Sequence, residues 1–146
     1  CPDTSAEWIE LYNAGAEPID LDGLELRDAA NTVGQVTGPL VVAPGSYLVL
    51  AIGDPAGWCD DTLSPDGFYG MRPQLNNRGP EWLVIQDGDR VLDQTATYGA
   101  AVAGSSWSTL TTDPVSNDAV SGWCTATPTP GQPNACRGRH PARSPR

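Results

Sequence analysis

The stretch Glu7-Trp8-Ile9-Glu10-Leu11-Tyr12-Asn13 changes character at every second residue. A period of two places Ile9 and Leu11 on one face and Trp8, Glu10 and Tyr12 on the other, as in a β-strand with one face on a core. The following Asn13-Ala14-Gly15 supplies turn residues that end the strand. The rest of the chain is therefore expected to form further short strands that close over this first one.

Apolar or alternating runs, separated by turn residues, recur along the chain. We expect strands at 18–21, 24–27, 33–36, 39–42, 47–52, 81–86, 89–98 and 105–110. The run 47–52 is almost continuously apolar, which predicts burial on both faces. Pro44-Gly45 suits a type II turn, and Asp87-Gly88 between two extended runs predicts a hairpin.

The segment 53–80 lacks periodicity and is expected to be a long, partly structured loop. No 3.6-residue periodicity supports a helix longer than a turn or two. Several short strands without helices between them predict an all-β antiparallel sandwich, formed by one domain over residues 1–136.

Charge is distributed unevenly along the 146 residues. All 18 acidic residues lie in 1–136 beside only four arginines, a net charge of −14 for this part. Such a body repels phosphate backbones, so nucleic acid is not an expected partner. The last ten residues, 137–146, hold the other four arginines and His140, and we expect a basic, disordered tail. No apolar run reaches the length of a transmembrane helix.

The four cysteines lack the close spacing of zinc ligands, and the only histidine lies in the tail. Disulfides are the preferred interpretation, which implies an oxidising, extracytoplasmic compartment. Three connectivities exist. We favour Cys124 with Cys136, because Pro128, Pro130, Gly131 and Pro133 between them favour a reversing loop, and this choice pairs Cys1 with Cys59. A cysteine at position 1 also permits a lipid anchor.

Several segments, taken in order, are similar to those of the lamin-tail domain as found in bacterial secreted proteins. They are 7–13, 18–28, 43–50, 75–79 before the Asp87-Gly88 hairpin, 104–107 and 127–134. The resemblance implies an immunoglobulin-like antiparallel β-sandwich and no catalytic residues. In bacteria, similar domains are parts of larger secreted or cell-surface proteins, sometimes beside nuclease or phosphatase domains. The family usually has a further strand about ten residues upstream of this start, and the basic tail has no family counterpart.

Residues for catalysis do not form a recognisable set. Serine or cysteine nucleophiles need a base, and His140 lies in the tail. Of the paired carboxylates, Glu7 and Glu10 fall on opposite faces of the first strand, which argues against glycoside cleavage. We therefore expect no enzyme activity.

Two sets of residues are candidates for binding. Asp54, Asp60, Asp61 and Asp66 in the long loop offer oxygens for calcium, against the simpler interpretation of a solvated acidic loop. Trp8, Tyr12 and Trp82 would form an exposed aromatic patch if Leu83 and Ile85 face inward. The alternative is that other elements cover this patch.

The sequence therefore predicts a non-catalytic structural or interaction module of a bacterial secreted or cell-surface protein, whose partner is a protein or a cell-surface polymer. No cofactor is expected, apart from the calcium alternative. The competing hypotheses are an accessory domain of a secreted nuclease or phosphatase, and a calcium- or carbohydrate-binding sandwich.

Overall fold

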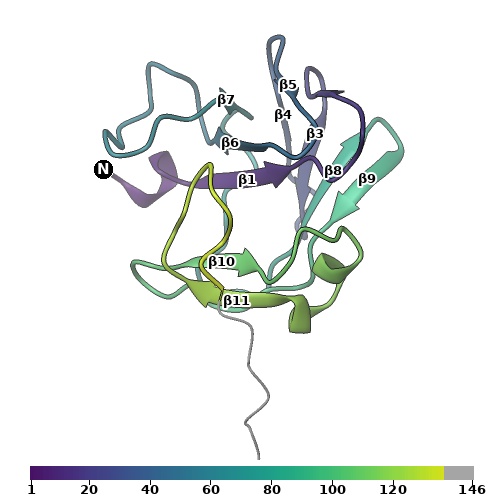
Figure 1. Ribbon diagram of the computed structural model, residues 1–146. Helices are drawn as coiled ribbons and strands as arrows, with labels where there is room; N and C mark the ends of the chain where they lie inside the picture. Colours follow the sequence, from purple (N-terminus) through teal and green to yellow (C-terminus); the bar gives the residue numbers. More distant parts are fainter. Residues whose placement is uncertain (137–146) are drawn as a thin grey trace, which may run out of the picture.

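The computed structural model describes residues 1–136, and short β-strands make up most of its regular structure (Figure 1). In chain order the elements are η1 (Asp3–Ser5), β1 (Trp8–Tyr12), β2 (Ile19–Asp20), β3 (Glu25–Asp28), β4 (Val33–Gln35), β5 (Val41–Val42), β6 (Tyr47–Ala51), β7 (Gly67–Phe68), β8 (Leu83–Asp87), β9 (Arg90–Gln94), β10 (Ser106–Thr109), η2 (Ser116–Asp118), η3 (Val120–Gly122) and β11 (Trp123–Ala126). The three η elements are single 3₁₀ turns, so within 1–136 the expectation of no long helix is confirmed.

The strands form four hydrogen-bonded groups. Their orders are β1-β6-β7, β2-β5, β4-β3-β8-β9 and β10-β11. All these pairs are antiparallel except β6 with the two-residue β7. The predicted antiparallel β-sandwich is therefore confirmed, with one short parallel pair that the sequence did not indicate.

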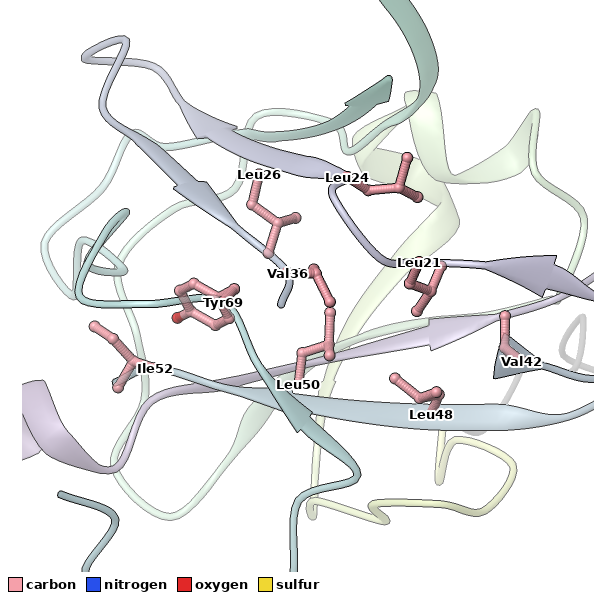
Figure 2. Packing of buried hydrophobic residues seen from close by; sticks show 9 residues of the cluster. All are labelled: Leu21, Leu24, Leu26, Val36, Val42, Leu48, Leu50, Ile52 and Tyr69. Atoms are coloured by element: carbon pink, nitrogen blue, oxygen red, sulfur yellow. The ribbon is translucent and has the colours of Figure 1, made fainter. Parts of the chain in front are cut away.

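The hydrophobic core lies between β6 and the segment that runs from β2 to β4. Leu48 and Leu50 of β6, with Ile52 just after it, project to the same side: Leu48 lies near Leu21 and Val42, Leu50 near Val36, and Ile52 near Tyr69 (Figure 2). Ile9 and Leu11 of β1 pack against the same cluster, as their alternation predicts. Residues 48–51 are all buried, which confirms that β6 is covered on both faces.

Two turns follow from glycine. Gly45, the third residue of the turn, has a φ of 70°, and a type II turn requires a positive φ at that position. Ser46 N–H closes the turn by donating to the Ala43 carbonyl at 3.1 Å. In the β8–β9 hairpin the two turn residues are Gly88 and Asp89, one position later than predicted. Gly88, with a φ of 55°, takes the first turn position, which suits a type II′ turn.

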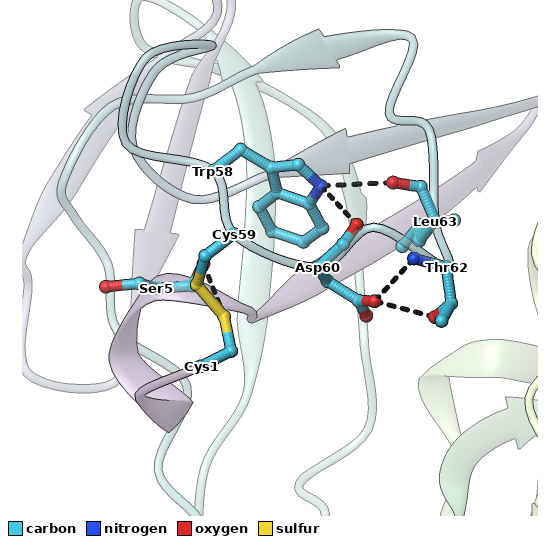
Figure 3. The surroundings of a disulfide bond; sticks show 7 residues. All are labelled: Cys1, Ser5, Trp58, Cys59, Asp60, Thr62 and Leu63. Carbon is cyan, nitrogen blue, oxygen red and sulfur yellow. Dashed lines mark hydrogen bonds between the residues drawn. A yellow bond between two sulfur atoms is a disulfide. The ribbon is translucent and has the colours of Figure 1, made fainter.

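Two disulfides join Cys1 to Cys59 and Cys124 to Cys136, the pairings favoured from the sequence. Figure 3 shows the first, which ties the start of the chain to the long loop. Because the Cys1 thiol is used in this bond, it is not available for the thioether of a lipid anchor. The disulfide and the lipid anchor are therefore mutually exclusive uses of Cys1, and the structure has the disulfide.

The loop 53–80 is ordered by local contacts. Trp58 Nε1 donates to the carbonyls of Asp60 and Leu63, each at 3.0 Å (Figure 3). Further along, β7 pairs with β6, and Gly53 bridges to Gly70. The predicted tail, 137–146, lies outside the described residues. Within 1–136, no helix has the length and apolar character needed to cross a membrane.

Candidate binding cleft

A cleft of about 610 Å³ lies between β1, β8 and the β10–β11 hairpin. We call it the β1 cleft. Its apolar wall includes Ile9, Leu11, Leu83, Ile85, Trp107 and Trp123. In Figure 1 the hairpin lies below β1, and the loop that follows β11 rises to β1. The volume falls within the range of about 300–1,000 Å³ that is typical of ligand pockets.

The cleft follows the edge of β1. Every residue from Ala6 to Gly15 lines it, both those whose side chains face the core and those that face the other way. A cleft that runs along the strand's edge meets both sets. Since β1 pairs with β6 on its other side and has no second neighbour in 1–136, this edge is unpaired.

The register identifies the unpaired backbone groups. Ile52 N–H donates to the Glu7 carbonyl at 3.0 Å, and Asn13 N–H donates to the Ser46 carbonyl at 3.1 Å. In an antiparallel pair the hydrogen-bonding direction alternates along the strand, so the odd-numbered residues of β1 face β6. The amides and carbonyls of Trp8, Glu10 and Tyr12 therefore point toward the cleft.

The loop between β11 and Cys136 borders the outer face of β1. Gly131 N–H donates to Glu10 Oε1 at 2.6 Å, and Asn134 Nδ2 donates to the Thr109 carbonyl at 3.2 Å. Burial raises the pKa of Glu10, the hydrogen bond from Gly131 lowers it, and nearby Asp66 raises it further, with burial dominant. The Cys124–Cys136 disulfide holds the base of this loop.

Asn117 organises the far end of the cleft. Its carbonyl accepts from Ala96 N–H and from Trp123 Nε1, each at 2.7 Å, and its Nδ2 donates to Asp93 Oδ2 at 2.7 Å. Burial raises the pKa of Asp93, although the bonds from Asn117 and Gln94 act in the opposite direction. These contacts fix the positions of β9 and β11 relative to each other.

Four residues of the wall carry buried polar atoms without a hydrogen-bond partner in residues 1–136. These atoms are Tyr98 Oη, Trp107 Nε1, Asn117 Oδ1 and Thr129 Oγ1. The Tyr98 and Trp107 rings lie 6.3 Å apart. Burial, followed by the charges of Glu81, Glu7 and Asp28, raises the pKa of Tyr98 far above its usual value, so its phenol stays neutral.

Comparison with known proteins identifies the sandwich. The family model of the Lamin Tail Domain matches residues 1–121, which is most of the chain. The chain belongs to the lamin tail domain family. Its members have an immunoglobulin-like fold, in agreement with the strands found here and with the resemblance seen in the sequence.

A second similarity concerns a shorter part of the chain. The chain is 41% identical over 69 residues to 5-methyltetrahydropteroyltriglutamate–homocysteine methyltransferase of Lactococcus lactis subsp. cremoris strain MG1363. The same enzyme of L. lactis subsp. lactis strain IL1403 is 38% identical over 69 residues. Each match covers 45% of this chain but only 9% of the relative, so methyl transfer is not carried over to this domain.

The predicted aromatic set is divided in this lamin tail domain. Trp8 and Tyr12 lie on β1 and line the cleft. Trp82 directly precedes β8 and is not among the residues of 1–136 that line it. Ile85 faces inward as expected, but Val84 on the other face is only 2% exposed. The alternative that other elements cover β8 is therefore correct for Val84, and Tyr12, at 36%, is the most exposed of the three aromatic residues.

The acidic residues proposed for calcium make local contacts. Asp54 Oδ1 accepts from Ala56 and Gly57 N–H, Asp60 Oδ1 accepts from Thr62, and Asp66 Oδ2 accepts from Val49 N–H at 2.8 Å. Asp61 is exposed. Among residues 1–136, no three acidic, histidine or cysteine side chains gather in a way that could hold a metal ion.

The two carboxylates considered for glycoside cleavage lie on opposite sides of β1. Glu7 is buried and accepts from Leu75 N–H at 2.8 Å, while Glu10 faces the loop on the opposite side of β1. The two carboxylates are thus placed apart, as the alternation of the strand predicts. The sequence did not reveal the cleft, because Trp107 and Trp123 lie about a hundred residues from β1 and only the fold brings them near it.

Proposed function

We propose that this lamin tail domain is a non-catalytic interaction module of an extracytoplasmic protein, and that it binds a protein or a polymer at the bacterial cell surface. The observation that carries the proposal is the combination of an immunoglobulin-like fold with two disulfides, one at each end of the described chain. Disulfides persist in oxidising compartments and are rare in the cytosol.

The charge of the domain also limits its partners. The body carries a net charge of −14, which disfavours nucleic acid and anionic membranes and favours neutral or basic surfaces. The apolar cleft on this acidic domain is a binding site suited to a neutral or basic ligand.

Cell fractionation tests the location. The full gene product, tagged and expressed in its source bacterium, should be found outside the cytoplasm, and its peptides should show Cys1 linked to Cys59 and Cys124 linked to Cys136. Cytoplasmic material in which these four cysteines are reactive thiols would contradict the proposal.

Binding to the cell surface tests the role. The labelled domain should be retained in a saturable manner by envelope preparations of the same bacterium, and unlabelled domain should compete with it. A domain that has been reduced and alkylated is the matched control. Failure of the intact domain to bind, with the fold verified by circular dichroism, would overturn the assignment of the envelope as its target.

A further inference from the structure

We propose that the β1 cleft accepts an extended peptide segment from another polypeptide, which adds a strand to the unpaired edge of β1. The inference rests on the proposed interaction role and names its site and the chemistry of the partner. The partner segment is apolar at alternate positions and neutral or basic at the positions between them.

The first argument is the hydrogen-bonding pattern. The amides and carbonyls of Trp8, Glu10 and Tyr12 point away from β6 and have no partner in residues 1–136. An unpaired edge of this kind is a template for another strand, and main-chain hydrogen bonds along it supply affinity. Only an extended backbone has amides and carbonyls at the spacing that this edge requires.

The second argument is the shape of the cleft. It follows β1, whose five residues correspond to roughly 17 Å of extended chain, and it continues along the flanking residues 6–7 and 13–15. A strand laid along β1 would direct alternate side chains inward, beside Ile9 and Leu11 and toward Ile85 and Trp107 on the opposite walls. The cleft's apolar wall therefore calls for valine, isoleucine or leucine at those positions.

The third argument is charge. The intervening side chains of the added strand would lie on the same face as Glu10, and the described body has a net charge of −14. Opposite charges on neighbouring strands stabilise a sheet, whereas like charges directly opposite each other destabilise it. A basic side chain across from Glu10 is therefore favoured, and an acidic one is disfavoured.

A second copy of this chain fits the cleft less well. Its β1 is already paired with its own β6 and would bring that sheet with it. Two copies could pair edge to edge, but the side chains of that strand would not enter the cleft. A free segment, which has no sheet of its own, satisfies both the edge and the apolar wall.

The probe is a fluorescein-labelled peptide, Thr-Val-Thr-Val-Arg-Val-Thr-Val. Its control, Thr-Val-Pro-Val-Arg-Val-Thr-Val, carries proline two positions before the arginine, where the amide faces the same side as that of the arginine and therefore faces β1. Proline removes one amide and hinders the extended ladder. Titration of the full chain, followed by fluorescence anisotropy, should give saturable binding of the first peptide, weakened at least tenfold by the proline. Equal binding of both peptides, or of neither, would overturn the inference.

Two variants locate the peptide. Glu10→Pro removes the amide that faces the cleft but no hydrogen bond to β6, and it should abolish binding. Glu10→Ala is the matched control, because it removes the carboxylate and keeps the amide, and it should reduce binding only a few-fold. Equal affinity of the two variants would contradict pairing at β1.

Hydrogen exchange on the unmodified chain gives a result that does not depend on either variant folding. In the free protein the amides of Trp8, Glu10 and Tyr12 should exchange quickly, while those of Ile9 and Leu11 are protected by β6. The peptide should protect at least Glu10 and Tyr12. Protection that grows with protein concentration alone would identify a second copy as the occupant and overturn the inference.

These results are separable from the fate of the proposed function. Envelope retention without peptide binding would leave an interaction module whose site is elsewhere. Peptide binding at β1 without envelope retention would leave the cleft assignment intact and remove the cell surface as its target.

Discussion

Glu10 connects the first strand to the loop that follows β11, and its protonation is coupled to folding. Burial raises its pKa above the usual 4.5. A carboxyl with a raised pKa in the folded state contributes stability below its unfolded pKa and loses that contribution as the pH rises through the folded value. The charged form at neutral pH is therefore less well accommodated than the neutral one.

Glu10→Gln should consequently change the pH profile of stability. Glutamine still accepts from Gly131 N–H but carries no charge to desolvate. The two proteins should therefore be similarly stable near pH 4, and the wild type should become the less stable of the two by pH 7. Urea unfolding of both proteins at the two pH values measures this difference. An unchanged difference between pH 4 and pH 7 would show that Glu10 is solvated in the folded domain.

Gly34 is a second residue whose role depends on close packing. It is buried in β4, and a Cβ there would lie 1.6 Å from the Arg72 carbonyl oxygen and 2.4 Å from that of Tyr69. Because both neighbours are backbone atoms, Gly34→Ala should destabilise the fold by about 3 kcal/mol. Gly57→Ala is the control, since its Cβ would lie no closer than 3.7 Å to a neighbour. Thermal unfolding should distinguish them clearly.

Strands with a strong periodic pattern could be predicted from sequence, and strands that depend on distant partners could not. The alternation in β1 and the apolar run of β6 locate both strands and their faces correctly. By contrast, β7 has two residues and exists only because it pairs with β6, and Trp123–Ala126 shows no alternation to mark β11. The turn of the β8–β9 hairpin lies one residue later than predicted. Gly88, which adopts a positive φ, is the first turn residue instead of the second.

The same reasoning explains what was missed at the candidate site. The alternation of β1 placed Trp8 and Tyr12 on one face of the strand and made them candidate binding residues. The opposite walls of the cleft come from β8 and β10–β11, which no local pattern connects to β1. No local pattern reports an unpaired edge, because pairing is a relation between strands. The contact of Gly34 with backbone carbonyls is hidden from the sequence for the same reason.

The two disulfides should contribute unequally to stability. They close loops of sequence separation 58 and 12, and in the chain-entropy model such cross-links are worth about 4 and about 3 kcal/mol. The double variant Cys1→Ser/Cys59→Ser should therefore lose more stability than Cys124→Ser/Cys136→Ser. Chemical denaturation of both variants and the wild type tests the order. The reverse order would mean that the loop beside Glu10 depends on its disulfide for more than chain entropy.

The long loop 53–80 allows a direct test of the calcium hypothesis. Asp54, Asp60 and Asp66 already accept hydrogen bonds from nearby backbone amides, and no metal-holding group occurs in residues 1–136. Millimolar calcium should therefore leave the melting temperature unchanged, with magnesium as the control. A specific rise with calcium would indicate that the loop rearranges to bind it, because a ligand that binds only the folded state stabilises that state.

The domain as a whole is a strongly acidic body in which several buried carboxylates accept hydrogen bonds from backbone amides. Glu7 accepts from Leu75 N–H, Glu81 accepts from Ala29 and Trp82 N–H, and Asp28 accepts from Thr32 N–H. With only four arginines among residues 1–136 and no lysine in the chain, most of the negative charge has no cation to balance it. Repulsion between these charges opposes the compact state.

Salt should therefore stabilise this domain. At pH 7, raising sodium chloride from 20 mM to 500 mM shortens the screening length from roughly 20 Å to about 4 Å, which weakens repulsion across the surface. The melting temperature should rise by a few degrees, and calorimetry at several salt concentrations measures it. The control is the same titration at pH 3, where most carboxyls are protonated and the rise should disappear. A melting temperature that falls with salt at pH 7 would mean that favourable ion pairs, rather than unbalanced acidic charge, dominate the electrostatics of the fold.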